Sequence, residues 1–70
     1  MTKRKIDLLN YLLMMMTQIE RKSSDLLVNY ANVYIGVLTD DTGVVMDFVD
    51  EIDDITLKTY TGFWINEKQS

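Results

Sequence analysis

The 70-residue chain contains no cysteine, no proline and no histidine, and it has only three glycines. Without cysteine there is no disulfide and no thiolate nucleophile, and without histidine there is no imidazole base. Zinc sites built from Cys and His are excluded for the same reason. The three scattered glycines form no phosphate-binding loop of the G-x-x-x-x-G-K-[ST] or G-x-G-x-x-G type. We therefore expect a protein that is not an enzyme, with no catalytic residue, no cofactor and no metal.

Long apolar runs are also absent. The longest run, Tyr11–Met16, has six residues, whereas a membrane-spanning helix needs about 20. Lys3, Arg4 and Lys5 resemble the basic start of an export signal, but no cleavage site of small residues follows them. We therefore expect a cytoplasmic protein and do not expect a membrane to be its partner.

Positive charge is scarce in the second half of the chain. The net charge of the whole chain is −4. Residues 1–22 carry five basic and two acidic side chains, whereas residues 39–70 carry two basic and eight acidic ones. Binding to nucleic acid requires a basic surface, so nucleic acid is not the expected partner. The acidic residues are typical of solvated turns, or of a surface that binds a basic protein. A third interpretation is a weak Mg²⁺ or Ca²⁺ site, but the spacing of these carboxylates does not favour one. The predicted acidic partner surface comprises Asp47, Asp50, Glu51, Asp53 and Asp54.

The first 22 residues have helical periodicity. Apolar residues recur at a spacing of three and four, no Pro or Gly interrupts, and Thr2 can cap the first turn. These features predict a helix over residues 3–22. Ser23, Ser24 and Asp25 then indicate a break or a new helix start, and residues 25–31 are compatible with either helix or strand.

Apolar side chains cover more than half of the circumference of this predicted helix. Either the helix packs centrally against its own chain, or a second face meets another subunit. A domain this small, without disulfides, barely offsets its chain entropy. We therefore predict a homo-oligomer, with a two-fold dimer as the first expectation. The predicted interface comprises Leu8, Leu9, Leu12, Leu13, Met15, Met16 and Ile19.

From residue 32 onward the composition is rich in β-branched and aromatic residues, which predicts strands over 33–38, 44–49 and 55–60 and a short fourth strand at 63–65. The expected fold is α+β, in a single domain that spans residues 1–70. A long N-terminal helix, within a helical region over residues 1–31, packs on a three- to four-stranded antiparallel β-meander (32–66), with a frayed tail at 67–70. The residues expected to face the helix are Val33, Ile35, Val37, Met46, Phe48, Ile55 and Leu57.

Two short resemblances bear on function. Asp41-Thr42-Gly43 resembles the D-T-G of aspartic proteases over three residues, but a turn explains it without catalysis, so Asp41 is expected to be exposed and not catalytic. The segment 43–48, followed by Ile52, Asp53, Ile55 and Leu57, resembles the second and third strands of Sm-like RNA-binding barrels, which also begin with a helix. That resemblance implies, as an alternative, a small SH3-like or Sm-like barrel that binds RNA or another nucleic acid.

The sequence is best interpreted as a small acidic protein-interaction module. It would self-associate through its apolar helix and bind a basic partner through its acidic turns. Its size and composition suit an accessory protein of a phage or mobile element.

Overall fold

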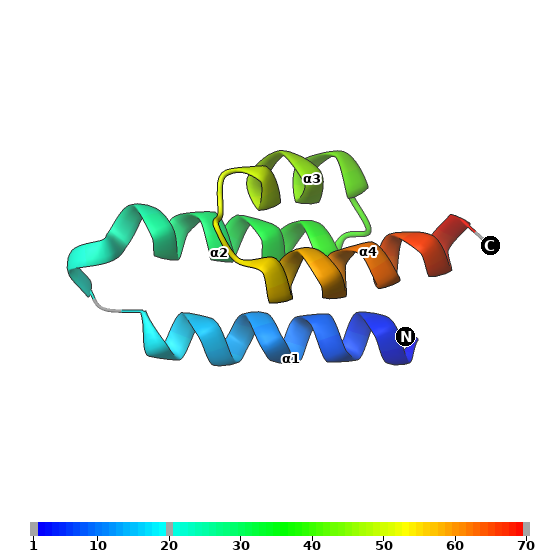
Figure 1. The fold of residues 1–70 in the computed structure, drawn as a ribbon, viewed down its shortest axis with the longest axis horizontal. Helices are drawn as coiled ribbons and strands as arrows, with labels where there is room; N and C mark the ends of the chain where they lie inside the picture. The colour runs from blue at the N-terminus through cyan, green and yellow to red at the C-terminus, as the bar shows by residue number, and fades with distance from the viewer. Residues whose placement is uncertain (1, 20, 70) are drawn as a thin grey trace.

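The fold consists of helices joined by short links. The computed structural model describes residues 2–19 and 21–69. They form α1 (Lys3–Gln18), a 3-10 turn η1 (Arg21–Ser23), α2 (Ser24–Leu38), α3 (Thr42–Asp50) and α4 (Ile55–Gln69). Figure 1 shows α1 and α2 as an antiparallel hairpin, α3 folded back along α2, and α4 returning beside α1 so that the two chain ends lie at the same end of the molecule.

The N-terminal helix is largely confirmed. The hydroxyl of Thr2 accepts a hydrogen bond from the backbone N–H of Lys5 at 3.3 Å, so Thr2 is the N-cap. The helix ends at Gln18 instead of residue 22, because Ile19 adopts an extended backbone (φ −76, ψ 129) before the 3-10 turn. Residues 25–31 belong to α2, which settles their structure as helix.

The predicted β-meander is wrong, and so is the alternative SH3-like or Sm-like barrel, because no strand occurs among the described residues. The segments 33–38, 44–49, 55–60 and 63–65 lie in α2, α3 and α4. The prediction assigned the wrong spacing to the buried residues. Val33 and Val37 are fully buried, whereas Ile35 between them is 56 % exposed, which is a helical spacing and not an alternating one. Burial at every third or fourth residue overrides the strand preference of β-branched side chains.

The same period explains the other core residues. Val37, Val33 and Leu57 are buried as expected and Phe48 is half-buried, but Met46 and Ile55, which were predicted to face the helix, are 43 % and 81 % exposed. Each α-helix contributes to one apolar cluster. The cluster comprises Leu8, Leu9, Leu12, Tyr30, Val33, Val37, Val45, Val49, Ile52, Leu57 and Trp64.

The segment Asp40–Gly43 is not the predicted hairpin turn, because Asp40 and Asp41 lie in the link between α2 and α3 and Thr42 and Gly43 already belong to α3. Asp40 has a positive φ of 58°, the N–H of Asp41 donates to the carbonyl of Gly36 at 2.8 Å, and the N–H of Asp40 donates to that of Val37 at 3.2 Å. This is the Schellman pattern that ends many helices. Asp41 then starts α3, since its carboxylate accepts from the N–H of Val44 at 3.1 Å. Turn-forming residues were recognised correctly here, but the elements that they connect were not.

Gly36 allows α2 and α3 to approach closely. A Cβ at this position would lie 2.7 Å from Cγ2 of Val45, which is fully buried, and 3.3 Å from Cγ1 of Val44. Gly62 in α4 is the opposite case, because a Cβ there would have no atom within 4 Å. The two helical glycines therefore differ in whether packing requires them.

We expect Gly36→Ala to lower the free energy of unfolding by about 1 kcal/mol, because the overpacking, at about 1–3 kcal/mol, outweighs the gain in helix propensity. Gly62→Ala should raise it by about 0.5–1 kcal/mol, because only the propensity changes. Urea unfolding followed by circular dichroism measures both. Equal effects of the two substitutions would contradict the close α2–α3 contact.

Candidate interaction surfaces

Four of the five residues of the predicted acidic partner surface are exposed. Asp47 and Asp50 lie on α3, Glu51 caps its C-terminal end, and Asp53 lies in the link to α4. Among the described residues, no hydrogen bond or ion pair engages these four side chains. Their charges are therefore available to a partner.

Asp54, the fifth, is used by the fold. One oxygen of its carboxylate accepts hydrogen bonds from the hydroxyls of Tyr11 and Tyr30, both at 2.6 Å. The other accepts from the backbone N–H of Leu57 at 3.1 Å and caps the start of α4. One half-buried carboxylate thus joins α1, α2 and α4, which the sequence alone did not indicate.

The cluster around Asp54 has the electrostatics of a structural contact. Partial burial acts to raise the pKa of the Asp54 carboxyl, but the hydrogen bonds from Tyr11, Tyr30 and the backbone outweigh it and hold the pKa below its usual value. Burial, reinforced by the hydrogen bond to Asp54, raises the pKa of Tyr11 to about 12 and also raises that of Tyr30. Both tyrosines therefore stay protonated near neutral pH, and neither is activated as a nucleophile or base.

We expect Asp54→Asn to lower the free energy of unfolding by about 2 kcal/mol at pH 7, because hydrogen bonds to a charged group are worth about 1.5–3 kcal/mol. Because the folded pKa of Asp54 lies below its unfolded value, this contribution is present above about pH 4 and is lost as the pH falls further. The matched control is Asp53→Asn, whose exposed side chain should change stability by less than about 0.5 kcal/mol. Equal losses for the two variants in urea unfolding at pH 7 would contradict this role.

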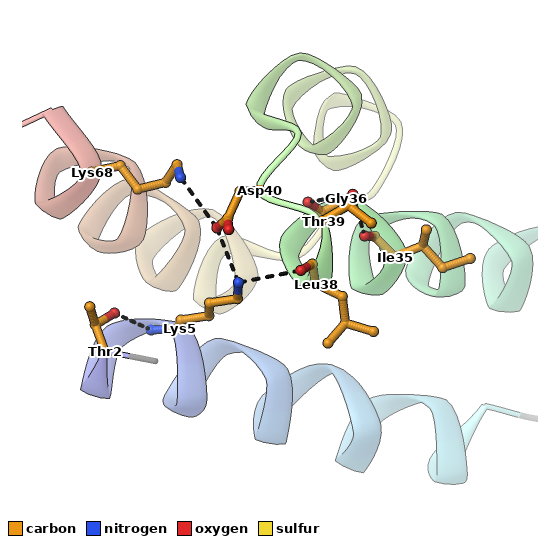
Figure 2. Close-up of polar contacts among 8 residues, drawn as sticks. All are labelled: Thr2, Lys5, Ile35, Gly36, Leu38, Thr39, Asp40 and Lys68. Atoms are coloured by element: carbon orange, nitrogen blue, oxygen red, sulfur yellow. Dashed lines mark hydrogen bonds and ion pairs between the residues drawn. The ribbon is translucent and has the colours of Figure 1, made fainter.

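Asp40 forms a second polar junction, at the end of the molecule where α1 begins and α4 ends. Its carboxylate accepts from the ammonium groups of Lys5 at 3.1 Å and Lys68 at 3.2 Å, and Lys5 also donates to the carbonyl of Leu38 at 3.3 Å (Figure 2). The hydrogen bonds from Lys5 and Lys68 lower the pKa of the Asp40 carboxyl. The junction connects α1, the α2–α3 link and α4, and it occupies two of the chain's basic side chains.

The apolar residues of the predicted oligomer interface divide into three groups. Leu8, Leu9 and Leu12 are buried in the core of their own chain. Met15, Met16 and Ile19 are partly buried and pack against that core. Leu13 is 45 % exposed and is available to a partner in this fold.

Exposed apolar residues occur on both helices of the α1–α2 hairpin. On α1, Arg4 lies over the ring of Phe63 (4.7 Å to the centroid) and Tyr11 contacts Tyr60 (5.2 Å between centroids), so this side of α1 faces α4. Residues two apart in a helix point in nearly opposite directions. Ile6 and Leu13 therefore face away from α4, and they are 42 % and 45 % exposed.

On α2 the exposed residues recur at a regular spacing. Val28, Ile35 and Leu38 are 54 %, 56 % and 43 % exposed, and with the half-buried Ala31 they form an i, i+3, i+7, i+10 stripe. Ile35 points away from Val33 and Val37, which are in the core. We call the five side chains Ile6, Leu13, Val28, Ile35 and Leu38 the outer hairpin face. The stripe on α2 was missed because 33–38 was interpreted as a strand.

Neither a metal centre nor a membrane span emerges from the geometry. Within residues 2–19 and 21–69, no three acidic side chains are grouped closely enough to hold a metal ion. None of the helices in these ranges combines the length and the apolar character that crossing a bilayer requires. Comparison of the chain with protein-family models, with curated proteins and with solved structures gives no match.

Proposed function

We propose that this chain is a non-enzymatic protein-interaction module that pairs with a second copy of itself through the outer hairpin face. The observation that carries the proposal is the uncharged apolar stripe on α2. Monomeric proteins seldom expose contiguous apolar surface of this kind without using it for binding. A stripe at spacings of three and four is also the pattern by which helices pack against one another.

The charge distribution favours a second copy as the occupant. The chain is acidic, with a net charge of −4, so most contacts between two copies bring like charges together. α2, which supplies three of the five side chains of the outer hairpin face, carries a single charged residue, Asp25. A two-fold axis through this face lets one patch serve both chains. Leu13, from the interface proposed on the first helix, belongs to the same face.

The acidic carboxylates give the module a second surface. This surface lies on α3 and the link after it, and not on α2. Its four carboxylates, Asp47, Asp50, Glu51 and Asp53, would complement the positive charge of a basic protein. The cytoplasm is the compartment we propose, and the cysteine-free composition fits it.

We expect the chain to show a concentration-dependent mass above 8.2 kDa in sedimentation equilibrium from micromolar to millimolar concentration. Ile35→Glu should raise the dissociation constant about 100-fold or more, because a buried apolar side chain contributes about 1.5–3 kcal/mol and a two-fold interface counts it twice. The exposed position should leave the helical circular dichroism unchanged.

The matched control is Ile55→Glu, the same substitution at an isoleucine that is 81 % exposed on α4. It should leave the mass distribution as in the unsubstituted chain. A constant mass near 8 kDa for the unsubstituted chain, or dissociation by Ile55→Glu and not by Ile35→Glu, would contradict the proposed pairing.

A further inference from the structure

A groove runs between α3 and α4 on a region of the surface that the outer hairpin face does not include. It has a volume of about 360 Å³ and is lined mainly by apolar atoms. Met46 and Val49 line it from α3, and Thr61, Gly62 and Ile65 line it from α4. Asp50 at the end of α3 and Lys58 and Asn66 on α4 complete its lining.

Gly62 has no structural reason to be glycine within this chain. Its φ is not positive, it lies within α4 and not at a turn, and a Cβ added there would meet nothing within 4 Å. A glycine inside a helix is destabilising relative to alanine. At Gly36 this cost is explained by the close approach of α3, but at Gly62 no described element of the chain makes such an approach. A partner that packs on the backbone of α4 would account for it.

Thr61 has a hydroxyl without a partner. The residue is 3 % exposed, it lines the groove, and its Oγ1 has no hydrogen bond. Thr59 in α4 and Thr39 at the C-cap of α2 each donate to the carbonyl four residues earlier at 2.9 Å, but Thr61 does not. A buried polar group of this kind is destabilising while it is unsatisfied. In this chain neighbouring atoms cover the hydroxyl, so a group seated in the groove would bond it only after a local rearrangement of side chains.

The α3 side of the groove is acidic, and among residues 2–19 and 21–69 no ion pair engages its carboxylates. Asp50 lines the groove, and Asp47 and Glu51 are exposed on the same short helix or directly after it. On the α4 side the groove is lined by one basic residue, Lys58. A ligand with its positive charges toward α3 would complement this arrangement.

A second copy of this chain is poorly suited to supply those positive charges. The chain has seven basic side chains against eleven acidic ones, and one of the seven, Lys58, already lines the groove. Lys5 and Lys68 are bonded to Asp40, and Arg4 lies over the ring of Phe63. Using these residues in a new contact would break existing ones. The charge complement is therefore better met by another protein.

We infer that the α3–α4 groove binds an amphipathic helical segment of a different protein, with apolar side chains against Met46, Val49 and Ile65 and with Lys or Arg toward Asp47 and Asp50. Helix-in-groove recognition uses anchors at i, i+3 or i+4, and i+7 in this way. The inference rests on the proposed function as an interaction module and names the class of its basic partner. It uses a surface that stays open when two copies pair through the outer hairpin face.

The test uses a fluorescein-labelled 15-residue peptide with leucine at helical spacing and lysine on one flank, and a second peptide in which glutamate replaces lysine. Fluorescence anisotropy against the full chain should show saturable binding of the lysine peptide, weakened by added salt, and no binding of the glutamate peptide. Absence of saturable binding by the lysine peptide would overturn the inference.

Variants separate the groove from general charge attraction. Asp47→Lys together with Asp50→Lys, and separately Gly62→Leu, should each weaken binding at least tenfold. The controls are Asp25→Lys, an exposed acid on α2, and Thr59→Leu, an exposed α4 residue outside the groove; each should change affinity less than twofold. A loss with Asp25→Lys equal to that with Asp50→Lys, or full binding by Gly62→Leu, would overturn the inference.

Two further measurements keep the outcome clear. Thr61→Val retains the side-chain shape, so it should leave the fold intact while weakening binding about threefold or more; unchanged affinity would remove the hydroxyl from the proposed site.

Sedimentation of the same samples distinguishes the groove from the pairing. Ile35→Glu monomers should bind the peptide normally, whereas dissociation of unsubstituted pairs by the peptide would assign the groove to the second copy and overturn the inference.

Discussion

The burial of a few apolar side chains at helical spacing is the constraint on which this structure depends. A 70-residue chain without disulfides has to offset its conformational entropy with a small core. Here the core draws on all four α-helices, with Trp64 as its largest member and Gly36 allowing α2 and α3 to approach. The apolar side chains that the core does not use are left at the surface. Ile35 and Ile55, for example, are 56 % and 81 % exposed.

Polar contacts hold the helices in register around that core. Asp54 accepts hydrogen bonds from α1, α2 and the first turn of α4. Asp40 joins the start of α1 to the end of α4 through Lys5 and Lys68. Both residues come from the acidic half of the chain. Their carboxylates therefore serve the fold, whereas those of Asp47 and Asp50 on α3 stay unpaired and are available for recognition.

The sequence predicted the first helix and its N-cap, Thr2, because an unbroken run of good helix formers leaves little alternative. The secondary-structure prediction was wrong from residue 32 onward. Because α2, α3 and α4 contain apolar residues on more than one face, their sequences fit a two-residue alternation as well as a helical spacing. Val33, Ile35 and Val37 show the ambiguity: all three are apolar, and the exposure of Ile35 alone reveals the helix. The acidic surface was recognisable from composition, but the role of Asp54 depends on Tyr11 and Tyr30, which are distant in sequence.

The central claim is that the outer hairpin face pairs two copies of the chain. The most direct measurement is a dilution series of ¹H–¹⁵N correlation spectra, which reports each backbone amide separately. Pairing predicts concentration-dependent shifts at Ile6, Leu13, Val28, Ile35 and Leu38, with Ile55 and Phe63 on α4 unchanged. Spectra that do not change from micromolar to millimolar concentration, or shifts confined to α4, would contradict it.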